Sequence, residues 1–285
     1  MVASPEFQHR AIGRFLQSGS GKIGLGITIV LLTIALFAPL LRPITPALSQ
    51  DVLSRLVPPS SAHLFGTDGL GRDLFTLVLH GVRTSLIVSL VSVGVGAIVG
   101  MSLGLIAGYF RGWLEILIGW ITDILLAFPS ILLAIAIVTI TSPSLQSVMV
   151  AVAIVQIPIY IRLTRSVVLS LREQEFIQAA KALGATPSWI ILRHILPGSL
   201  TPIVVQATLS IGTATLEAAG LGFLGLGAQP PTPELGTMLS DAFRGGYSFT
   251  SPWTTIFPGL VITLIVLAFN LLGDGLRDAL DPRAG

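Results

Sequence analysis

Apolar residues gather in six stretches along the 285-residue chain, and each stretch is nearly free of charge. A helix that crosses the hydrocarbon core of a membrane needs roughly 20 apolar residues. The pattern therefore predicts an all-α polytopic membrane protein with six transmembrane helices. The predicted spans are 23–41, 85–108, 116–140, 148–161, 200–224 and 256–272.

Three of these spans contain residues that are unusual inside a membrane. Asp123 and Pro129 interrupt the third span, Pro158 lies in the short fourth span, and Glu217 lies in the fifth. Acidic residues in a span usually face the protein interior, where they form structural pairs or line a pathway. Asp123 and Glu217 are therefore candidates for a translocation path, with a structural role as the alternative for both and an interfacial position as a further one for Asp123.

The second span has a glycine at every fourth position, and the four are Gly96, Gly100, Gly104 and Gly108. Positions four apart lie nearly above one another on a helix. Without Cβ atoms along that stripe, a neighbouring helix can approach closely. The stripe predicts tight packing within the chain, and a helix that lines a moving interface is the alternative.

The polar residues between the spans divide the chain into segments. The pattern predicts a cytoplasmic N-terminus over 1–22, a first transmembrane helix over 23–41 and an extracytoplasmic segment over 42–84. A core with five transmembrane helices follows over 85–285, and it contains a cytoplasmic loop over 162–200. A further long segment on the outside, 228–253, is rich in Pro and Gly, which is typical of ordered turns.

The distribution of Lys and Arg predicts the orientation. With the N-terminus inside, eleven of the sixteen Lys and Arg residues fall in cytoplasmic segments. Because cytoplasmic loops carry an excess of these residues, both termini are predicted to be cytoplasmic. The first span could also be a signal peptide, but its apolar run exceeds the about 7–15 residues of a signal h-region. We therefore expect an uncleaved anchor.

The composition supports burial in lipid, because 52% of the residues are hydrophobic and only 11% are charged, against about 25% charged in soluble domains. The net charge of +2 gives no indication of nucleic acid binding, and the absence of Cys excludes disulfides and thiolate chemistry.

Two short motifs resemble nucleotide-binding patterns without their context. GLGFLG at 220–225 matches the dinucleotide pattern G-x-G-x-x-G, but it ends an apolar helix and does not join a strand to a helix. GSGK at 19–22 lacks the Ser or Thr of a phosphate loop. The four His show no metal-ligand spacing, so we expect no cofactor or metal in this chain.

The cytoplasmic loop has the sequence pattern of two helices joined by a sharp elbow. Good helix formers occupy 175–183, and Gly184 then fits a left-handed position after the helix. Ala185 follows as a short turn, Thr186 can cap a second helix, and Pro187 fits its first position. The second helix is predicted over 188–195, ending at Pro197. Such an element is expected to dock a soluble partner, with an amphipathic helix on lipid headgroups as the alternative.

These residues resemble a known family. Gln178-Ala179-Ala180, then Gly184, then the segment 194–197 is similar to the Glu-Ala-Ala loop of ABC importer permeases that depend on a binding protein. The acidic position of the motif is Gln178 here, and Glu175 lies about one turn earlier. The segments FGTDGLGRDLF, LGFLGLGAQPPTPELGTML and FNLLGDGLRDALDP also resemble the dipeptide, oligopeptide and nickel branch of that family, which includes glutathione importers.

The resemblance implies a permease subunit of an ATP-driven importer, with a type I importer-like fold and no enzymatic activity of its own. Its implied partners are a second homologous permease, two cytoplasmic ATPase subunits that carry ATP and Mg²⁺, and an extracytoplasmic solute-binding protein. Peptides are the expected solute, with nickel or glutathione as alternatives. From the residues alone, an ion-coupled secondary transporter that uses Asp123 and Glu217 is a further alternative. The residues implied in ATPase coupling are Glu175, Gln178, Ala179, Ala180, Gly184, Ala185, Thr186, Pro187, Trp189, Arg193, His194 and Pro197.

Overall fold

A computed structural model describes residues 12–280, and every regular element in that range is a helix. The all-α fold class predicted from the sequence is therefore confirmed. The α-helices are α2 (Gly19–Leu41), α3 (Ile44–Ala47), α4 (Leu74–Phe110), α5 (Gly112–Ala127), α6 (Ser130–Thr141), α7 (Leu145–Arg172), α8 (Glu175–Ala182), α9 (Pro187–Ile190), α10 (Leu196–Phe223), α11 (Leu235–Arg244) and α12 (Trp253–Leu280), with a 3-10 helix η1 (Val52–Ser54) and a π-helix η2 (Ile191–Ile195).

Within residues 12–280, five helical segments are long and apolar enough to cross a membrane, and a bent helix pair makes up to six. Four of the five are the single helices α2, α4, α7 and α12, and the fifth is the continuous segment Pro187–Phe223. The predicted number of spans therefore agrees with the structure when the bent pair, α5 and α6, is counted as one span.

The third predicted span, 116–140, is not one straight helix. α5 and α6 meet at 96° across a break at Phe128 and Pro129. Proline has no backbone N–H to donate, and it restricts the residue before it to extended backbone; Phe128 accordingly has ψ 138°. The apolar pattern continues on both sides of the break, so hydropathy predicts a single span where the backbone forms two helices.

The fourth predicted span, 148–161, is too short, because α7 continues to Arg172. Arg162 and Arg165 end the apolar run but not the helix, since arginine is a good helix former; both pair with acids on α5. Arg162 Nη2 lies 2.8 Å from Asp123 Oδ1, and Arg165 Nε donates to Glu115 Oε1 at 3.1 Å. These two ion pairs join α5 to α7.

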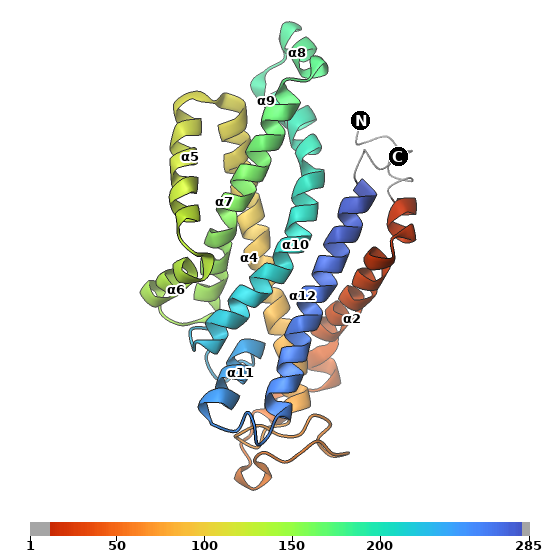
Figure 1. The fold of residues 1–285 in the computed structure, drawn as a ribbon, viewed down its shortest axis with the longest axis vertical. Helices are drawn as coiled ribbons and strands as arrows, with labels where there is room; N and C mark the ends of the chain where they lie inside the picture. The colour runs from red at the N-terminus through yellow and green to blue at the C-terminus, as the bar shows by residue number, and fades with distance from the viewer. Residues whose placement is uncertain (1–11, 281–285) are drawn as a thin grey trace.

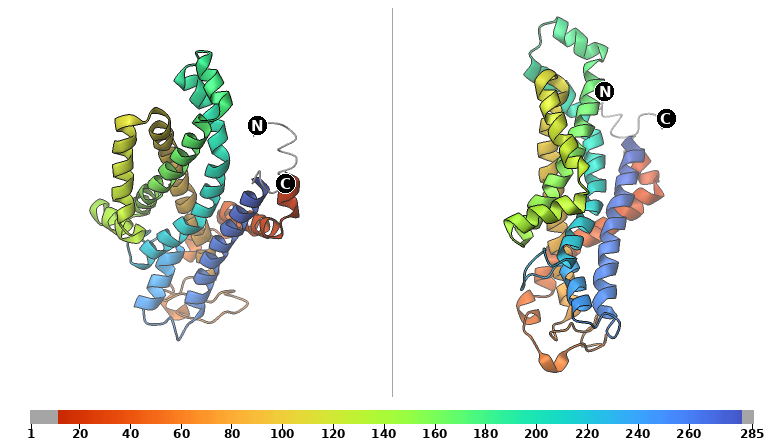
Figure 2. Two further views of the ribbon diagram at one scale, coloured as in Figure 1. Left: turned by 45° about the horizontal axis from the view of Figure 1, so that its top comes forward. Right: turned by 60° about the vertical axis from the view of Figure 1, so that its left-hand side comes forward.

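The helices form an elongated bundle with α4, α7 and α10 at its centre (Figure 1). α2 and α12 lie side by side at one flank, and α5 and α6 pack on the other, against α7 (Figure 2). The start of α2, the end of α12 and the pair α8–α9 lie at one end of the bundle, which we call the elbow end. α3, η1 and α11 lie at the other, which we call the opposite end.

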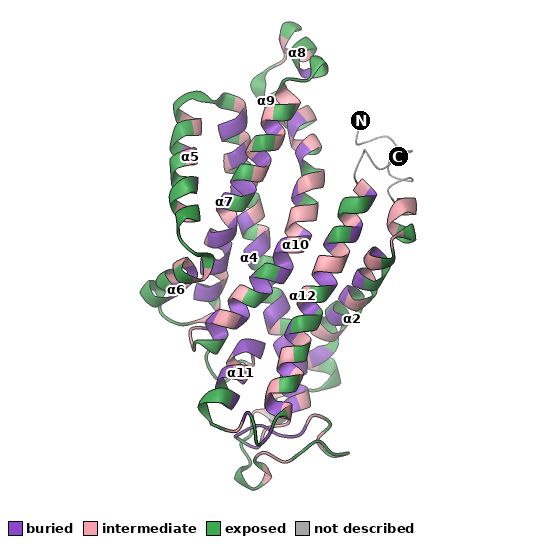
Figure 3. Ribbon diagram, viewed as in Figure 1, coloured by how far each residue is buried: buried purple, intermediate pink, exposed green. Residues whose placement is uncertain are grey.

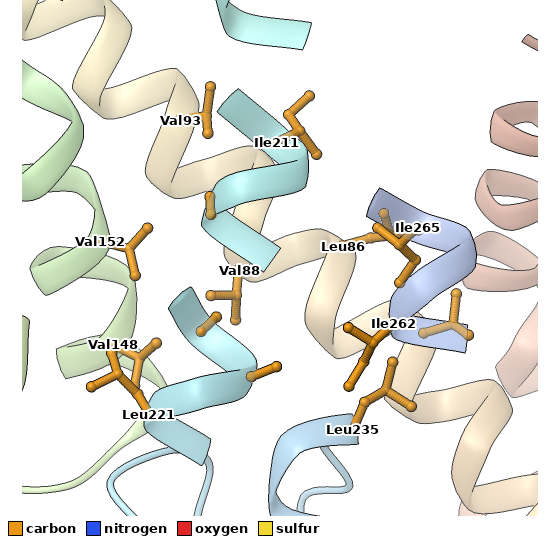
Figure 4. Packing of buried hydrophobic residues seen from close by; sticks show 14 of the residues in the cluster. Leu86, Val88, Val93, Val148, Val152, Ile211, Leu221, Leu235, Ile262 and Ile265 are labelled. Atoms are coloured by element: carbon orange, nitrogen blue, oxygen red, sulfur yellow. The ribbon is translucent and has the colours of Figure 1, made fainter. Parts of the chain in front are cut away.

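Buried residues concentrate where the central helices meet, whereas the outer faces of α5 and α6 are largely exposed (Figure 3). The core joins α4, α7, α10, α11 and α12 in one apolar cluster. Figure 4 shows Val88 of α4, Val148 of α7 and Leu221 of α10 in one part of it, and Leu86, Leu235 and Ile262 in another. The exposed apolar faces are available to lipid or to another membrane subunit.

The glycine stripe of α4 packs against α7, which confirms the predicted tight packing within the chain. The α4 residues are Gly96, Gly100, Gly104 and Gly108, and the α7 residues that face them are Gln156, Tyr160, Thr164 and Val168. A Cβ atom added to any of the four glycines would lie 2.6–2.8 Å from the Cβ of its facing residue. The two helices can therefore approach this closely only because α4 has no side chains along the contact.

Candidate coupling elbow and transmembrane path

Residues 175–197, which we call the elbow, begin with α8 and a glycine turn. Gly184 has φ +82°, so its backbone is left-handed. The N–H of Gly184 donates to Lys181 O at 2.9 Å, and that of Ala185 donates to Ala180 O at 3.0 Å. This pair of bonds is the Schellman motif, which satisfies the last carbonyls of a helix. The predicted role of Gly184 at the end of the first helix is therefore confirmed.

The second helix of the elbow begins as predicted. Thr186 has extended backbone, and its Oγ1 accepts a hydrogen bond from the N–H of Trp189 at 3.4 Å. Pro187 occupies the first turn. A backbone N–H at that position has no acceptor within the helix, so the missing N–H of proline costs no hydrogen bond. Gly184, Thr186 and Pro187 thus fix the angle at which the chain turns from α8 into α9.

The predicted end of the second helix at Pro197 is wrong. α9 continues through the π-helix η2 directly into α10, and the N–H of Leu196 donates to Ile191 O, five residues back. The wider turn of a π-helix accommodates a proline ring that would clash in a regular α-helix. The elbow and the fifth span are consequently one continuous helical segment.

A small apolar cluster fastens the elbow to the end of the bundle. Ile177 of α8, Ile190 of α9 and Ile195 of η2 are fully buried together with Val168 of α7. The side-chain amide of Gln178 donates to the backbone carbonyl of Arg172 at 2.9 Å. These contacts place the elbow in one orientation relative to α7 and α10.

The outer surface of the elbow is exposed and partly apolar. Most of the predicted coupling residues are exposed, and three are only partly so; those three are Ala180, Ala185 and His194. His194 packs edge-on against Trp189 and Phe176, with ring centroids 4.9 and 5.7 Å apart. Leu183 is 89% exposed and Leu192 is 65% exposed. Phe176, Leu183 and Leu192 were not among the predicted coupling residues, although all three are exposed on the elbow. Large apolar residues in a polar loop were the signal that could have indicated them.

The two acidic candidates for a path lie in different surroundings and are not brought together. Asp123 is 65% exposed and pairs with Arg162, so its contact is between α5 and α7. Glu217 is half-buried on α10, and its nearest polar side chains are Ser130 of α6 and Gln156 of α7. One Glu217 oxygen, Oε2, is buried and accepts no hydrogen bond from a described protein group.

The opposite end has a cavity of about 650 Å³ between the turn at 66–73, the loop at 225–233 and α11. Its charged lining is Arg55, Asp68, Arg72, Asp241 and Arg244. Asp68 accepts hydrogen bonds from the N–H groups of Leu70 and Arg72 and pairs with Arg72 Nε at 2.7 Å. The motif FGTDGLGRDLF thus forms a compact, internally bonded turn.

Glu234, which the sequence did not single out, joins the cavity wall to the core. It caps α11 by accepting hydrogen bonds from the N–H groups of Gly236 at 2.8 Å and Thr237 at 2.9 Å. Its side chain is pressed against Gly222, which has no room for a Cβ atom. Burial raises the pKa of Glu234 to about 7, although the two backbone hydrogen bonds act in the opposite direction.

Several apolar spans, a core built on α4, α7 and α10, and a capped elbow outside the spans define a multi-pass membrane transport protein. Residues 100–285 match the family described as the binding-protein-dependent transport system inner membrane component, and residues 7–59 match the N-terminal transmembrane domain of oligopeptide transport permease C. The chain belongs to the former family, the inner-membrane permeases of ABC importers.

Curated relatives agree with this assignment over nearly the whole chain. The dipeptide transport system permease protein DppC of Alkalihalophilus pseudofirmus is 54% identical, over 98% of this chain and 93% of the relative. The glutathione transport system permease protein GsiD of Pectobacterium atrosepticum is 47% identical, over 95% of this chain and 89% of the relative. An inward-facing structure of the MetNI methionine ABC transporter has a similar fold, with a TM-score of 0.61 at 23% identity, over 72% of this chain and 97% of the matched chain.

Proposed function

We propose that this chain forms, with a second homologous permease, the membrane path through which an ATP-driven importer takes up short peptides. An extracytoplasmic binding protein delivers the peptide, and two cytoplasmic ATPase subunits supply the energy. ATP and Mg²⁺ are bound by those subunits. The dipeptide permease relative supports the dipeptide class, and the glutathione permease relative supports glutathione, itself a short peptide, as the second candidate.

The geometry of the elbow is the observation that carries the proposal. Two short helices are fixed by the Gly184 turn and the Thr186 cap, and they are held to the bundle by Ile177 and Ile190. Their outer side exposes Trp189 and other apolar groups. A rigid, exposed element with aromatic and apolar groups suits docking to a protein partner, since interface anchors are enriched in aromatic residues.

Under this proposal the elbow end faces the cytoplasm. The excess of Lys and Arg in the predicted cytoplasmic segments supports this orientation. The start of α2 and the end of α12 lie at the same end as the elbow (Figure 1). The cavity beside α11 then faces the extracytoplasmic side, where the binding protein delivers its solute.

Uptake by the purified importer in proteoliposomes tests the function. We expect uptake of a labelled dipeptide only when ATP is present on the elbow side and the binding protein on the opposite side. Glutathione replaces the dipeptide in a parallel assay and decides between the two candidates. Uptake by this chain alone under an ion gradient would overturn the proposal and favour a secondary transporter.

Cysteine cross-linking tests the docking of the ATPase directly, because the chain has no native Cys. Single cysteines at Leu183 and Leu192 of the elbow are expected to cross-link to the ATPase. Phe249, at the opposite end and 91% exposed, is the matched control and is expected to give no ATPase cross-link. Equal yields from Leu192 and Phe249 would contradict both the docking and the orientation.

A further inference from the structure

A polar stripe runs along one face of α10, which is otherwise an apolar span. Its members are Gln206, Ser210, Thr213 and Glu217. Their spacing of four, three and four residues places them on one side of a helix, over roughly 16 Å of its length. The Gln206 amide lies 3.2 Å from Ser210 Oγ, so part of the stripe is already linked. A continuous line of polar side chains in a span indicates a surface that meets something other than lipid.

Glu217 is the only charged residue of α10, and it differs from the acids on α5. Glu115 and Asp123 each have an Arg partner on α7. No ion pair with Glu217 is found within residues 12–280. Because a carboxylate at membrane depth is costly without a partner, Glu217 is suited to bind a cation that is not part of this chain.

The face of α7 next to this stripe presents further buried polar side chains. Gln156 and Tyr160 are 1% and 0% exposed, and they lie beside Glu217 and Ser210 respectively. The Gln156 Oε1 and Tyr160 hydroxyl oxygens have no hydrogen-bond partner among the described groups, and neither does Glu217 Oε2. Buried polar groups are almost always hydrogen-bonded in folded proteins. Three such oxygens along one seam therefore suggest a ligand that donates several hydrogen bonds.

We propose that Glu217, with Gln156, binds the protonated amino terminus of a peptide during its passage along the α7–α10 seam. This inference rests on the proposed function and adds a recognition site to it. A primary ammonium carries one positive charge and three N–H donors, which suits the Glu217 carboxylate and the Gln156 amide oxygen beside it. The remaining stripe, from Thr213 to Gln206, can then hydrogen-bond the peptide backbone toward the elbow end.

The chemistry of the seam favours an ammonium group over a transition metal. Nickel is bound best by imidazole and related ligands, and the seam contains none. Among residues 12–280, no group of three or more His, Cys, Asp or Glu side chains is arranged to hold a metal ion. A single carboxylate surrounded by amide and hydroxyl oxygens is sufficient for a singly charged organic cation.

Photo-cross-linking of the wild-type importer locates the site without any mutation. A labelled dipeptide with a photoreactive group beside its free amino terminus is delivered by the binding protein, and turnover is then trapped with vanadate. We expect the label on peptides of this chain that contain Gln156 or Glu217. If the importer takes up this dipeptide and the label falls elsewhere, the inference fails while the proposed function stands; if no dipeptide is taken up, the proposed function itself fails.

Variants test the role of the charge. Glu217→Gln is expected to reduce dipeptide uptake about tenfold or more, as the loss of a charged hydrogen-bond partner predicts, and to abolish the label. Stimulation of ATP hydrolysis by the loaded binding protein should stay within about twofold of wild type, and Glu217→Asp should recover part of the uptake. Asp123→Asn makes the same chemical change in an acid that has an Arg partner, and it is expected to preserve uptake.

Three results would overturn the assignment. One is wild-type uptake in the Glu217→Gln importer. Another is an equal loss of uptake in Glu217→Gln and Asp123→Asn. The third is a parallel fall of assembly, ATP hydrolysis and uptake in Glu217→Gln, combined with no label at the seam in the wild-type importer, which would assign Glu217 a structural role.

Discussion

Substitution of Gly184 by valine should uncouple ATP hydrolysis from transport. Gly184 has φ +82°, and a Cβ atom added there would meet nothing within 4 Å. The cost is therefore one of backbone conformation alone, about 1–2 kcal/mol for an ordinary L-residue in the left-handed region and more for a β-branched one. Since 1.4 kcal/mol corresponds to a factor of ten, the equilibrium constant between the docking-competent elbow and its other conformations should fall by about tenfold or more.

The ratio of peptide transported to ATP hydrolysed in proteoliposomes measures this loss of coupling. Gly184→Val should lower the ratio strongly, whereas Gly184→Asn should lower it little, because asparagine tolerates the left-handed region better. Gly112 is the matched control, since it has φ +67° and equally open surroundings but is the first residue of α5, outside the elbow. Normal coupling in Gly184→Val, or an equal loss in Gly112→Val, would refute the assignment of the elbow.

Other contacts give predictions that separate packing from charge. Gly100→Val should lower the thermal unfolding temperature in detergent, because its Cβ would lie 2.6 Å from Tyr160 Cβ and overpacking costs typically about 1–3 kcal/mol; Gly94→Val on the same helix meets nothing within 4 Å and should have little effect. Glu234 binds its proton more tightly in the folded than in the unfolded protein, so its contribution to stability is complete below pH 4.5 and is lost as the pH rises to about 7. Glu234→Gln should remove this slope from the unfolding temperature measured across pH 4.5–8, and an unchanged slope would show that Glu234 is not its source. A double-mutant cycle should give a larger coupling energy for Arg165–Glu115, whose acid is 19% exposed, than for Arg162–Asp123, whose acid is 65% exposed; equal values would contradict this.

The turn of the elbow could be predicted residue by residue because its causes are local. Gly184 permits a left-handed backbone, Thr186 supplies a cap, and Pro187 fits a first turn, and each effect acts within about four residues. The continuation past Pro197 could not be predicted, because a proline in a polar loop ordinarily ends a helix. It depends on the π-helix η2 and on burial of Ile195 against α7, which is a contact distant in sequence.

Other features were predictable only in part, because they depend on which helices become neighbours. The glycine stripe indicates a close approach, and only the structure identifies α7 as the partner. The polarity of Asp123 is visible in the sequence, and its pairing with Arg162 is not. The sequence did not indicate that Glu234 is buried, because a glutamate in a proline-rich loop is ordinarily exposed. Its burial results from packing of α11 against Gly222.

The continuity of the elbow with α10 links the two proposed sites mechanically. The segment Pro187–Phe223 has 37 residues, which corresponds to roughly 55 Å of helix. A displacement of α9 by a docked ATPase would therefore reach Glu217 without crossing a loop. The two acids on α5 have no such connection, since they join the elbow only through the side chains of α7. If α10 moves relative to α7, the seam between Glu217 and Gln156 opens or closes, so the same motion that follows ATP binding at one end would expose or release the ammonium site near the other.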